Sequence, residues 1–560
     1  MKIRLAASTV AMAFALVGAT GEDGPEIHIL ATPSAMNAET GGTVDIAETV
    51  HPKAGVAWTP SFSLGTKAPG MSHTQGVDAL TVTDAQGQIP GNLARNDAEG
   101  SFVWTASRAA QGDVVARYRL PVVNDNPISG GPPTYLRIEG NSISGVGDML
   151  FLQPKLEGDY RISVDWDLKA MRPGAETVST YGDGNFSLPP GSVGRLAESF
   201  YLAGKVERYP APGKHIFSAV WPGDPGFDLR PPLAWSEKLY GYMSRFFGDK
   251  AEPEYRIFMR FNPAANAGGG AAFPHSFLWT YGEGVSGTAM QSILGHEMTH
   301  TWTAGVSKWF DEGLAVYYQI RLPWRAGMLT SDEYLSDINK TAARYYTNEL
   351  VGTDFKQVMT DYWGDRRKMV VPYDRGAIYL ASVDEALRQK SGGKRSLDDV
   401  VRIIVARLRD GQSLSDKDWV DLMRTELGQP GVDAYDAMIA GKVQLPGSKA
   451  YGPCFRRADA MIRRYNLGYT VKQPSDGRGI YYVQNLVPGS EADKAGIHNG
   501  DAIILRTNTD GAQRDPDMTL TVKITRDGKT FPITYLPRAE PVAAYKWERD
   551  PAVPESQCRP

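Results

Sequence analysis

Two histidines that stand four residues apart constrain this chain more than any other feature of its sequence. The run Gly295-His296-Glu297-Met298-Thr299-His300 contains the pattern His-Glu-x-x-His. On an α-helix, residues i and i+4 lie one turn apart on the same face, so both imidazoles can reach one metal ion at about 2.0–2.1 Å. Glu297 then lies beside the metal, where it can take a proton from a metal-bound water. The pattern predicts a helix over residues 287–304 that holds one zinc ion per chain.

A second predicted helix supplies a third ligand. Eleven residues separate His300 from Glu312, which lies in a run with helical periodicity, Trp309-Phe310-Asp311-Glu312-Gly313-Leu314-Ala315-Val316-Tyr317-Tyr318. A turn near residues 305–307 would bring Glu312 back against the first helix and complete a site of two histidines and one carboxylate, with a water in the fourth position. Asp311 is the neighbour that could take this role instead.

These motifs resemble the gluzincin metallopeptidases. Residues 312–317, Glu-Gly-Leu-Ala-Val-Tyr, match the E-G-x-A-x-Y context of the family's third ligand, and residues 371–376, Val-Pro-Tyr-Asp-Arg-Gly, resemble its V-P-Y-E-K-G run. The resemblance implies that Glu312 binds the metal, that Glu297 is the catalytic base, and that the Tyr373 hydroxyl stabilises an oxyanion. The alternative for Tyr373 is a core tyrosine near the start of a helix. The linker between His300 and Glu312 is shorter than is usual in aminopeptidases of this class.

The surrounding sequence predicts several domains. Residues 21–190 consist of short segments rich in Val, Thr, Tyr and Trp between clusters of Gly, Pro, Asn and Asp, which indicates an N-terminal all-β domain of sandwich type. Residues 191–450 contain strand patterns at 255–261 and 275–281 and are then mainly helical, with capping pairs Ser396–Asp399 and Ser415–Asp418. The gluzincin resemblance implies that this is a thermolysin-like α+β catalytic domain with a helical part.

The last part of the chain resembles the PDZ domains of exported bacterial proteases. The run VPGSEADKAGIHNGDAIIL at 487–505 has a Pro-Gly-Ser turn, a short helix, and Gly500-Asp501 before an Ile-rich strand. The resemblance predicts a PDZ domain at 455–545, with an exposed sheet edge near residues 467–470 where an extended peptide ligand could pair. A generic small β-rich domain is the alternative.

The only two cysteines, Cys454 and Cys558, bracket this region, and in an oxidising compartment we expect a disulfide between them. Two separate buried thiols are the alternative.

The start of the chain indicates export. Lys2 and Arg4 precede a short apolar run that ends among small residues near Ala19, as in a secretory signal peptide at residues 1–20. The run is shorter than the roughly 20 residues that span a bilayer, which disfavours the alternative of a membrane anchor. We therefore expect a periplasmic or secreted protein with no transmembrane segment in its mature chain. A net charge of -4 argues against a nucleic-acid partner.

The order of the three domains resembles the glycyl aminopeptidase family, which implies peptide or protein substrates and a preference for small N-terminal residues. Family members that bind a free N-terminus carry a glutamate in a Gly-Gly-x-Glu strand. Here the candidate substrate-binding strand is Gly269, Gly270, Ala271 and Ala272, with Ala272 in the place of that glutamate. Because this carboxylate is missing, an endopeptidase of the same chemistry stays open. A non-catalytic, PDZ-containing peptide-binding protein is the third hypothesis.

Overall fold

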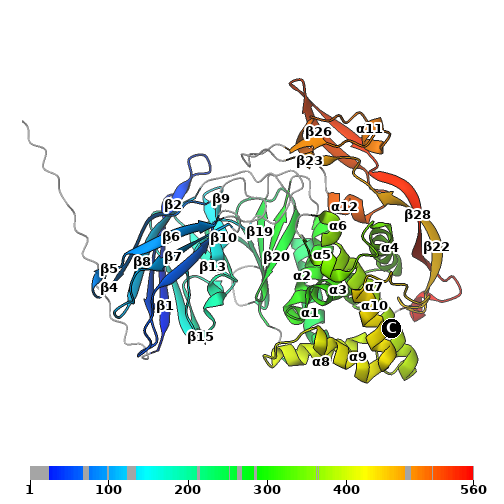
Figure 1. The fold of residues 1–560 in the computed structure, drawn as a ribbon, viewed down its shortest axis with the longest axis horizontal. Helices are drawn as coiled ribbons and strands as arrows, with labels where there is room; N and C mark the ends of the chain where they lie inside the picture. Colours follow the sequence, from blue (N-terminus) through cyan, green and yellow to red (C-terminus); the bar gives the residue numbers. More distant parts are fainter. Residues whose placement is uncertain are drawn as a thin grey trace, which may run out of the picture.

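The computed structural model describes residues 24–66, 75–96, 100–122, 134–210, 215–250, 253–261, 268–282, 287–360, 362, 365–472, 481–506 and 509–558. The predicted signal peptide lies outside these ranges. Figure 1 shows three parts in chain order: a β-rich N-terminal unit, a middle unit that begins with a sheet and continues with helices, and a small C-terminal unit at the end of a two-stranded ribbon. Among the described helices, none is both long and apolar enough to cross a membrane.

The N-terminal unit is built from three sheets that share one hydrophobic core. In its first strand the side chains of Ile27, Ile29 and Ala31 are fully buried and alternate with partly exposed residues, the period of two that a half-buried strand requires. The sheet orders are β15-β12-β1-β2-β8-β4-β5, β11-β3-β7-β6 and β14-β13-β16-β10-β9. The strands are β1 (Glu26–Pro33), β2 (Gly42–His51), β3 (Ser61–Gly65), β4 (Asp78–Asp84), β5 (Gly87–Gln88), β6 (Gly91–Asn96), β7 (Ser101–Ala106), β8 (Val114–Val122), β9 (Arg137–Glu139), β10 (Ser142–Val146), β11 (Gln153–Pro154), β12 (Tyr160–Trp166), β13 (Glu176–Ser179), β14 (Gly182–Asp183), β15 (Phe186–Gly191) and β16 (Phe200–Gly204). The expected β-rich N-terminal domain is confirmed.

The middle unit begins with a five-stranded sheet of order β17-β18-β19-β21-β20. Its strands are β17 (Glu207–Tyr209), β18 (Phe217–Trp221), β19 (Tyr255–Phe261), β20 (Gly268–Phe273) and β21 (Ser276–Tyr281). The three central strands are parallel, and the two edge strands are antiparallel to their neighbours. Alternate residues of β19 face opposite sides. Ile257 and Met259 belong to the core with helix α1 (Arg230–Phe247), whereas Phe258 packs with Phe200 and Leu202 of β16.

The boundary between these two units differs from the expected one. The strand β16 pairs with β10 and β13 of the N-terminal unit, whereas β17 pairs with β18 of the middle unit. The division therefore falls between Gly204 and Glu207 and not near residue 190. A fully buried strand such as Phe200–Gly204 has no exposed face whose pattern would indicate which sheet it joins.

Helices and a long ribbon complete the middle unit. The ribbon strands β22 (Phe455–Tyr465) and β28 (Arg538–Arg549) pair antiparallel and pack on α4, and Phe455 and Trp547 belong to the core of the middle unit. Most of the ribbon thus lies in the range that the sequence assigned to a PDZ domain. The helices are α2 (Gly287–Thr303), α3 (Lys308–Arg325), α4 (Ser331–Thr347), α5 (Phe355–Met359), α6 (Arg366–Met369), α7 (Val371–Ser391), α8 (Leu397–Arg409), α9 (Asp416–Leu427) and α10 (Gln429–Ile439).

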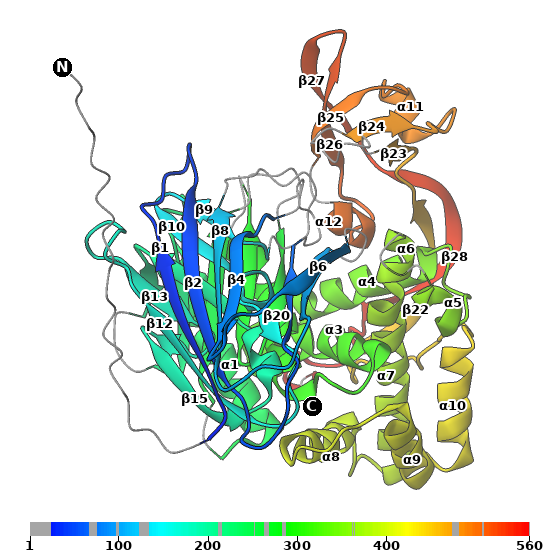
Figure 2. The ribbon, with the colours of Figure 1, turned by 60° about the vertical axis from the view of Figure 1, so that its left-hand side comes forward.

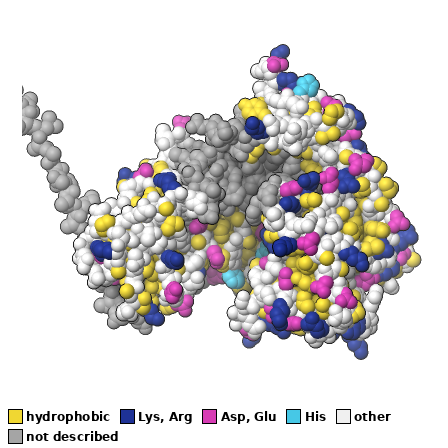
Figure 3. All heavy atoms as spheres, in the orientation of Figure 1, with side chains coloured by type: hydrophobic (Ala, Val, Ile, Leu, Met, Phe, Trp, Pro, Cys, Tyr) yellow, Lys and Arg dark blue, Asp and Glu magenta, His cyan; other side chains and the backbone are white. Residues whose placement is uncertain are grey.

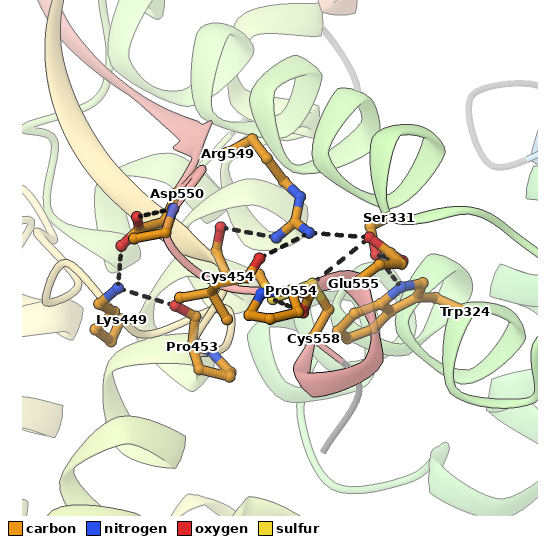
Figure 4. Close-up of a disulfide and its surroundings, with 12 residues drawn as sticks. Trp324, Ser331, Lys449, Pro453, Cys454, Arg549, Asp550, Pro554, Glu555 and Cys558 are labelled. Atoms are coloured by element: carbon orange, nitrogen blue, oxygen red, sulfur yellow. Dashed lines mark hydrogen bonds and ion pairs between the residues drawn. A yellow bond between two sulfur atoms is a disulfide. The ribbon is translucent and has the colours of Figure 1, made fainter.

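The disulfide between Cys454 and Cys558 is confirmed, and both cysteines are fully buried. Figure 4 shows that it joins the start of the ribbon to the segment that follows the ribbon's second strand. Around it, Lys449 pairs with Asp550 at 2.9 Å and Arg549 pairs with Glu555 at 3.0 Å. The disulfide and these ion pairs tie the base of the ribbon to the segments that precede and follow it.

The C-terminal unit lies between the two ribbon strands in sequence. Its antiparallel sheet has the order β23-β24-β25-β26-β27, so β23 is an edge strand. The Ser490 side chain caps α11 by accepting from the Asp493 N–H, which explains the Pro-Gly-Ser turn before this helix. The elements are β23 (Thr470–Lys472), β24 (Tyr481–Gln484), α11 (Glu491–Lys494), β25 (Ala502–Arg506), α12 (Thr509–Arg514), β26 (Leu520–Arg526) and β27 (Lys529–Tyr535). The order of strand, turn, short helix and strand agrees with the sequence pattern, and the PDZ assignment itself stays a prediction.

A buried carboxyl at the junction of the first two units predicts a pH effect. Burial raises the pKa of Glu139 to about 7, against the opposing charges of Arg137 and Arg260. Since the folded-state pKa of this acid is higher than its unfolded value, its contribution to stability is present at low pH and is lost as the pH rises toward 7. A shift of this size corresponds to a loss of about 3 kcal/mol.

We expect Glu139→Gln to remove this loss. Urea unfolding at pH 5 and at pH 8 should show a smaller drop in the free energy of unfolding for the variant than for the wild type. An identical drop in both proteins would contradict the assignment of the effect to Glu139.

Candidate metal centre

A tight turn brings the two predicted ligand helices together. The helices α2 and α3 are separated only by residues 304–307, where Gly305 has a φ of +105°, a conformation that L side chains rarely adopt. The Asp311 carboxylate accepts hydrogen bonds from the N–H groups of Gly305 and Val306 at 3.1 and 3.2 Å. Asp311 therefore stabilises the turn and is not part of the ligand cluster. From the sequence alone, Asp311 is an alternative to Glu312 as the third metal ligand.

The side chains of His296, His300 and Glu312 converge. The Nε2 atoms of the two histidines are 3.3 Å apart, and the Glu312 Oε2 atom is 3.2 Å from that of His296 and 3.5 Å from that of His300. Each of the three side chains is exposed over only 10–12% of its surface. Among the described residues, this is the group of histidine, cysteine and acidic side chains whose ligand atoms are close enough to hold one metal ion.

The distances between these three atoms fit zinc. Ligand atoms at about 2.0–2.1 Å from a tetrahedral zinc ion must lie about 3.3–3.4 Å from one another. The three separations in the cluster are close to this value. Two histidines and one glutamate leave the fourth position of a tetrahedral site open, as in catalytic zinc sites. The residues present therefore fit a zinc ion.

The charges in the cluster keep its carboxylate ionised. Burial alone would raise the pKa of Glu312, but the hydrogen bonds and positive charges of His296 and His300 outweigh it and lower the pKa below the ordinary value. Burial disfavours the protonated form of His300 and lowers its pKa. The neighbouring carboxylates of Glu312 and Glu297 raise this pKa by more, so the net shift is upward. Glu312 therefore stays ionised and offers a carboxylate oxygen to a metal ion.

Glu297 and Tyr373 lie beside the cluster, on α2 and α7. Burial raises the pKa of the Glu297 carboxyl, and the charges of His296 and His300 offset this only in part. The Tyr373 ring stacks against the His296 imidazole with 5.7 Å between ring centroids and an interplanar angle of 10°. Burial, and then the carboxylate of Glu312, raise the pKa of Tyr373 well above its usual range. The structure thus brings together all five residues that the sequence placed in the site.

Two further residues contact the cluster and were missed at the sequence level. The Lys308 Nζ atom lies 2.5 Å from Glu312 Oε1, and the Gln319 Oε1 atom lies 3.3 Å from His296 Nδ1. Both stand on α3, four residues before and seven residues after Glu312, so helical spacing places them on its face. That spacing was the signal available in the sequence.

The strand β20 forms the edge of the sheet next to α2. It contains Gly269, Gly270, Ala271 and Ala272, as the sequence predicted, and it pairs antiparallel with β21. Ala271 packs against the core shared with the N-terminal unit, whereas Ala272 is exposed. Figure 3 shows that the surface is hollowed between the N-terminal unit and the helices of the middle unit. Among the strands that the structure describes, β20 pairs only with β21, so its outer edge has no strand partner there.

Two glycines fix the distance between the helices that carry Glu312 and Tyr373. A Cβ atom added at Gly313 would lie 2.6 Å from the Gly376 Cα atom, and one added at Gly376 would lie 2.4 Å from the Trp309 carbonyl oxygen. The backbones of α3 and α7 therefore touch, and no side chain fits between them. This contact gives a physical reason for the glycines in the Glu-Gly and Tyr-Asp-Arg-Gly runs.

We expect Gly313→Ala to separate the two helices. The overpacked contact should lower the free energy of unfolding by about 1–3 kcal/mol and weaken metal binding by Glu312. Urea unfolding and zinc content measure the two effects. Gly352→Ala is the matched control, because the nearest atom to its added Cβ is 4.0 Å away. Equal stability of the two variants would show that the helices can absorb the methyl group.

Comparison with solved structures supports the fold. A structure of an aminopeptidase N family protein from Idiomarina loihiensis is similar over 95% of this chain and 100% of that chain, with a TM-score of 0.67 and 16% sequence identity. At this identity the likeness shows a shared multidomain fold with a β-rich N-terminal part and a helical part. No model of a protein family matches the chain, and no curated protein does.

Two weaker similarities carry no argument about the fold because their TM-scores are below 0.5. One is to an M1 zinc metallopeptidase from Deinococcus radiodurans, with a TM-score of 0.46, 15% identity, and coverage of 76% of this chain and 96% of that chain. The other is to yeast LTA4 hydrolase, with a TM-score of 0.47, 12% identity, and coverage of 74% and 67%.

Proposed function

We propose that this chain is a zinc-dependent peptidase of the gluzincin type. The observation that carries the proposal is the convergence of His296, His300 and Glu312 at the spacing of tetrahedral zinc ligands, with Glu297 on the same helix. A fold shared with an aminopeptidase N family protein supports it. Three protein ligands with an open fourth position are typical of zinc sites that activate water.

The chain's own side chains supply the proton transfers. A zinc ion held by His296, His300 and Glu312 would polarise the scissile carbonyl and lower the pKa of the attacking water. Glu297 accepts the proton of that water and later gives it to the leaving amine. Burial raises the pKa of this carboxyl above its ordinary value. Tyr373, kept protonated by its raised pKa, donates a hydrogen bond to the developing oxyanion.

We propose that the substrates are peptides or proteins bound in an extended form along β20. Aminopeptidase-like cleavage after small N-terminal residues follows from the sequence resemblance. A second candidate, endopeptidase cleavage, is favoured by Ala272, since this exposed position offers no carboxylate to pair with a substrate ammonium group. A non-catalytic peptide-binding protein is less favoured, because it has no chemical need for Glu297 and Tyr373 beside three metal ligands.

One experiment separates these candidates. Zinc content would be measured together with cleavage of a peptide library in which each sequence has either a free or an acetylated N-terminus. Cleavage of free ends only would support the aminopeptidase, and cleavage of both would support the endopeptidase. Stoichiometric zinc without cleavage would refute the peptidase proposal and leave the binding protein.

We also propose that the C-terminal unit is a PDZ domain that binds an extended peptide at β23. Support comes from the position of β23 at the sheet edge and from a cavity of about 490 Å³ beside it. The cavity is lined by β23, by Thr509 and Gln513 of α12, and by Arg344 and Asn348 from the middle unit. Calorimetric titration of the intact protein with a peptide library would test this proposal, and no binding to any peptide would argue for a generic β-rich domain.

The proposed localisation is periplasmic or secreted. The disulfide Cys454–Cys558 supports it, since such bonds persist mainly in oxidising compartments. Fractionation of cells that express the full-length chain, followed by N-terminal sequencing, would test both the location and the removal of residues 1–20.

A further inference from the structure

A chain of polar contacts leads from the metal cluster to the C-terminal unit. The His296 Nδ1 atom lies 3.3 Å from Gln319 Oε1, and the Gln319 Nε2 atom donates to Asp337 Oδ2 at 3.3 Å. On its other side, Asp337 Oδ1 accepts a hydrogen bond of 2.6 Å from Arg514, which belongs to α12. Four side chains from α2, α3, α4 and α12 are thus connected in one line.

The chemistry of these groups fixes the tautomer of His296. An ionised carboxylate can only accept hydrogen bonds, so Asp337 must face the amide nitrogen of Gln319. The amide oxygen of Gln319 then faces His296 and accepts from it, which places the proton of a neutral imidazole on Nδ1. In this neutral tautomer Nε2 carries the lone pair, which a metal ion bound between His296, His300 and Glu312 requires.

The chain of contacts is shielded from water. Gln319 is buried, and the side chains of Asp337 and Arg514 are exposed over only 12% and 20% of their surface. A charged hydrogen bond in such surroundings is stronger and more rigid than one on the open surface. Arg514 also donates to the Thr341 hydroxyl at 3.2 Å, so α12 contacts α4 at two successive turns. Without Arg514, the Asp337 charge would lack its close cationic partner.

The helix α12 is itself held in place by the ribbon. The buried Arg538 of β28 donates to three carbonyl oxygens at the end of α12, those of Ala512, Asp515 and Pro516. Figures 1 and 2 both show α12 against the end of the helical part and below the small sheet. The position of Arg514 is therefore set by the ribbon and the C-terminal unit together.

We propose that the C-terminal unit contributes to the metal centre. Its Arg514 acts through Asp337 and Gln319 to position the His296 imidazole for metal binding. Arg514, Asp337 and Gln319 are positioning residues and touch neither metal nor substrate. The proposal rests on the proposed zinc site, but it concerns metal affinity and not the reaction. It makes the C-terminal unit necessary even for substrates that never contact it.

Zinc affinity measured by competition with a chromophoric chelator tests the proposal on the full chain. We expect Gln319→Leu to raise the zinc dissociation constant by about 10–100-fold, the usual cost of losing a partner behind a metal ligand, and Arg514→Gln to raise it by about 3–10-fold. The visible absorption spectrum of the Co²⁺-substituted protein should change in both variants, because the His296 ring is no longer held in one orientation.

The structure offers a matched control and a rescue. Lys340→Gln removes the ion pair of 3.0 Å between Lys340 of α4 and Asp515, the residue that follows α12. This ion pair lies nearer the surface and outside the chain of contacts. This variant should keep the wild-type zinc affinity and Co²⁺ spectrum. The double variant Gln319→Glu with Asp337→Asn exchanges the carboxylate and the amide between the two positions. The carboxylate at position 319 would accept from His296 and from the amide at position 337, so this variant should recover most of the affinity that Gln319→Leu loses.

Three outcomes would overturn the proposal. The first is wild-type zinc affinity and an unchanged Co²⁺ spectrum in Arg514→Gln. The second is an equal loss in Arg514→Gln and Lys340→Gln, which would mean that general docking of the helices matters and not the chain of contacts. The third is a double variant that folds and binds zinc no better than Gln319→Leu. A wild-type chain that binds no zinc would instead refute the proposed function, and this inference with it.

Discussion

Replacing Glu297 by glutamine is expected to lower kcat by about 10²–10⁴-fold while zinc stays bound, because glutamine keeps the size of the side chain but cannot accept a proton from water. Glu297 lies on α2 between His296 and His300 in sequence, and burial raises the pKa of its carboxyl above the ordinary value. No other side chain of the cluster can replace it, since the ligand atoms of His296, His300 and Glu312 face one another.

Steady-state kinetics together with zinc analysis of the purified variant would test this expectation. Glu297→Asp is the companion variant. It keeps the base but withdraws it by one methylene, so its kcat should fall between those of the wild type and of Glu297→Gln. Wild-type turnover in the glutamine variant would show that another group is the base, and loss of zinc would show that Glu297 helps to hold the metal.

The second large effect is expected for Tyr373→Phe, which should reduce kcat by about 10²–10³-fold with little change in KM. The hydroxyl is the only part that changes, and its contribution as an oxyanion donor is made mainly in the transition state. The ring should keep its stacking against His296.

Tyr379→Phe is the matched control for this measurement. Tyr379 is a buried tyrosine on the same helix, but its hydroxyl accepts a hydrogen bond from the Trp419 indole and lies in the helical core. The control should lose some stability and keep its kcat. If both variants had the same kcat, Tyr373 would be a core residue, the alternative that the sequence had left open.

The sequence predicted that His296, His300 and Glu312 come together because its signals are local. The spacing of His296 and His300 on one helix determines their common face, and Glu312 follows after a turn too short to carry it elsewhere. The capping pairs Ser396–Asp399 and Ser415–Asp418 were likewise confirmed, since both partners of a capping box lie within one turn. Short-range rules of this kind do not depend on the rest of the fold.

The contacts between distant parts of the chain could not be read in this way. Gln319, Asp337 and Arg514 are ordinary polar residues in sequence, and only the folded chain shows that α12 reaches α4. The ribbon strands read as part of the following domain because nothing in their pattern marks that Phe455 and Trp547 pack on the helical core. The expected and observed domain boundaries differ at Gly204 and at the ribbon strands, because packing between distant parts of the chain sets both.

The core that joins the first two units limits how the chain can be divided. Val220, Phe258 and Leu278 on one face of the five-stranded sheet pack against Phe200 and Leu202 of the N-terminal unit. A fragment that began after Gly204 would turn this apolar face toward water and would tend to aggregate. The β-rich unit therefore cannot be removed without exposing the core of the middle unit. Shortened versions of the chain for crystallisation or engineering must keep it.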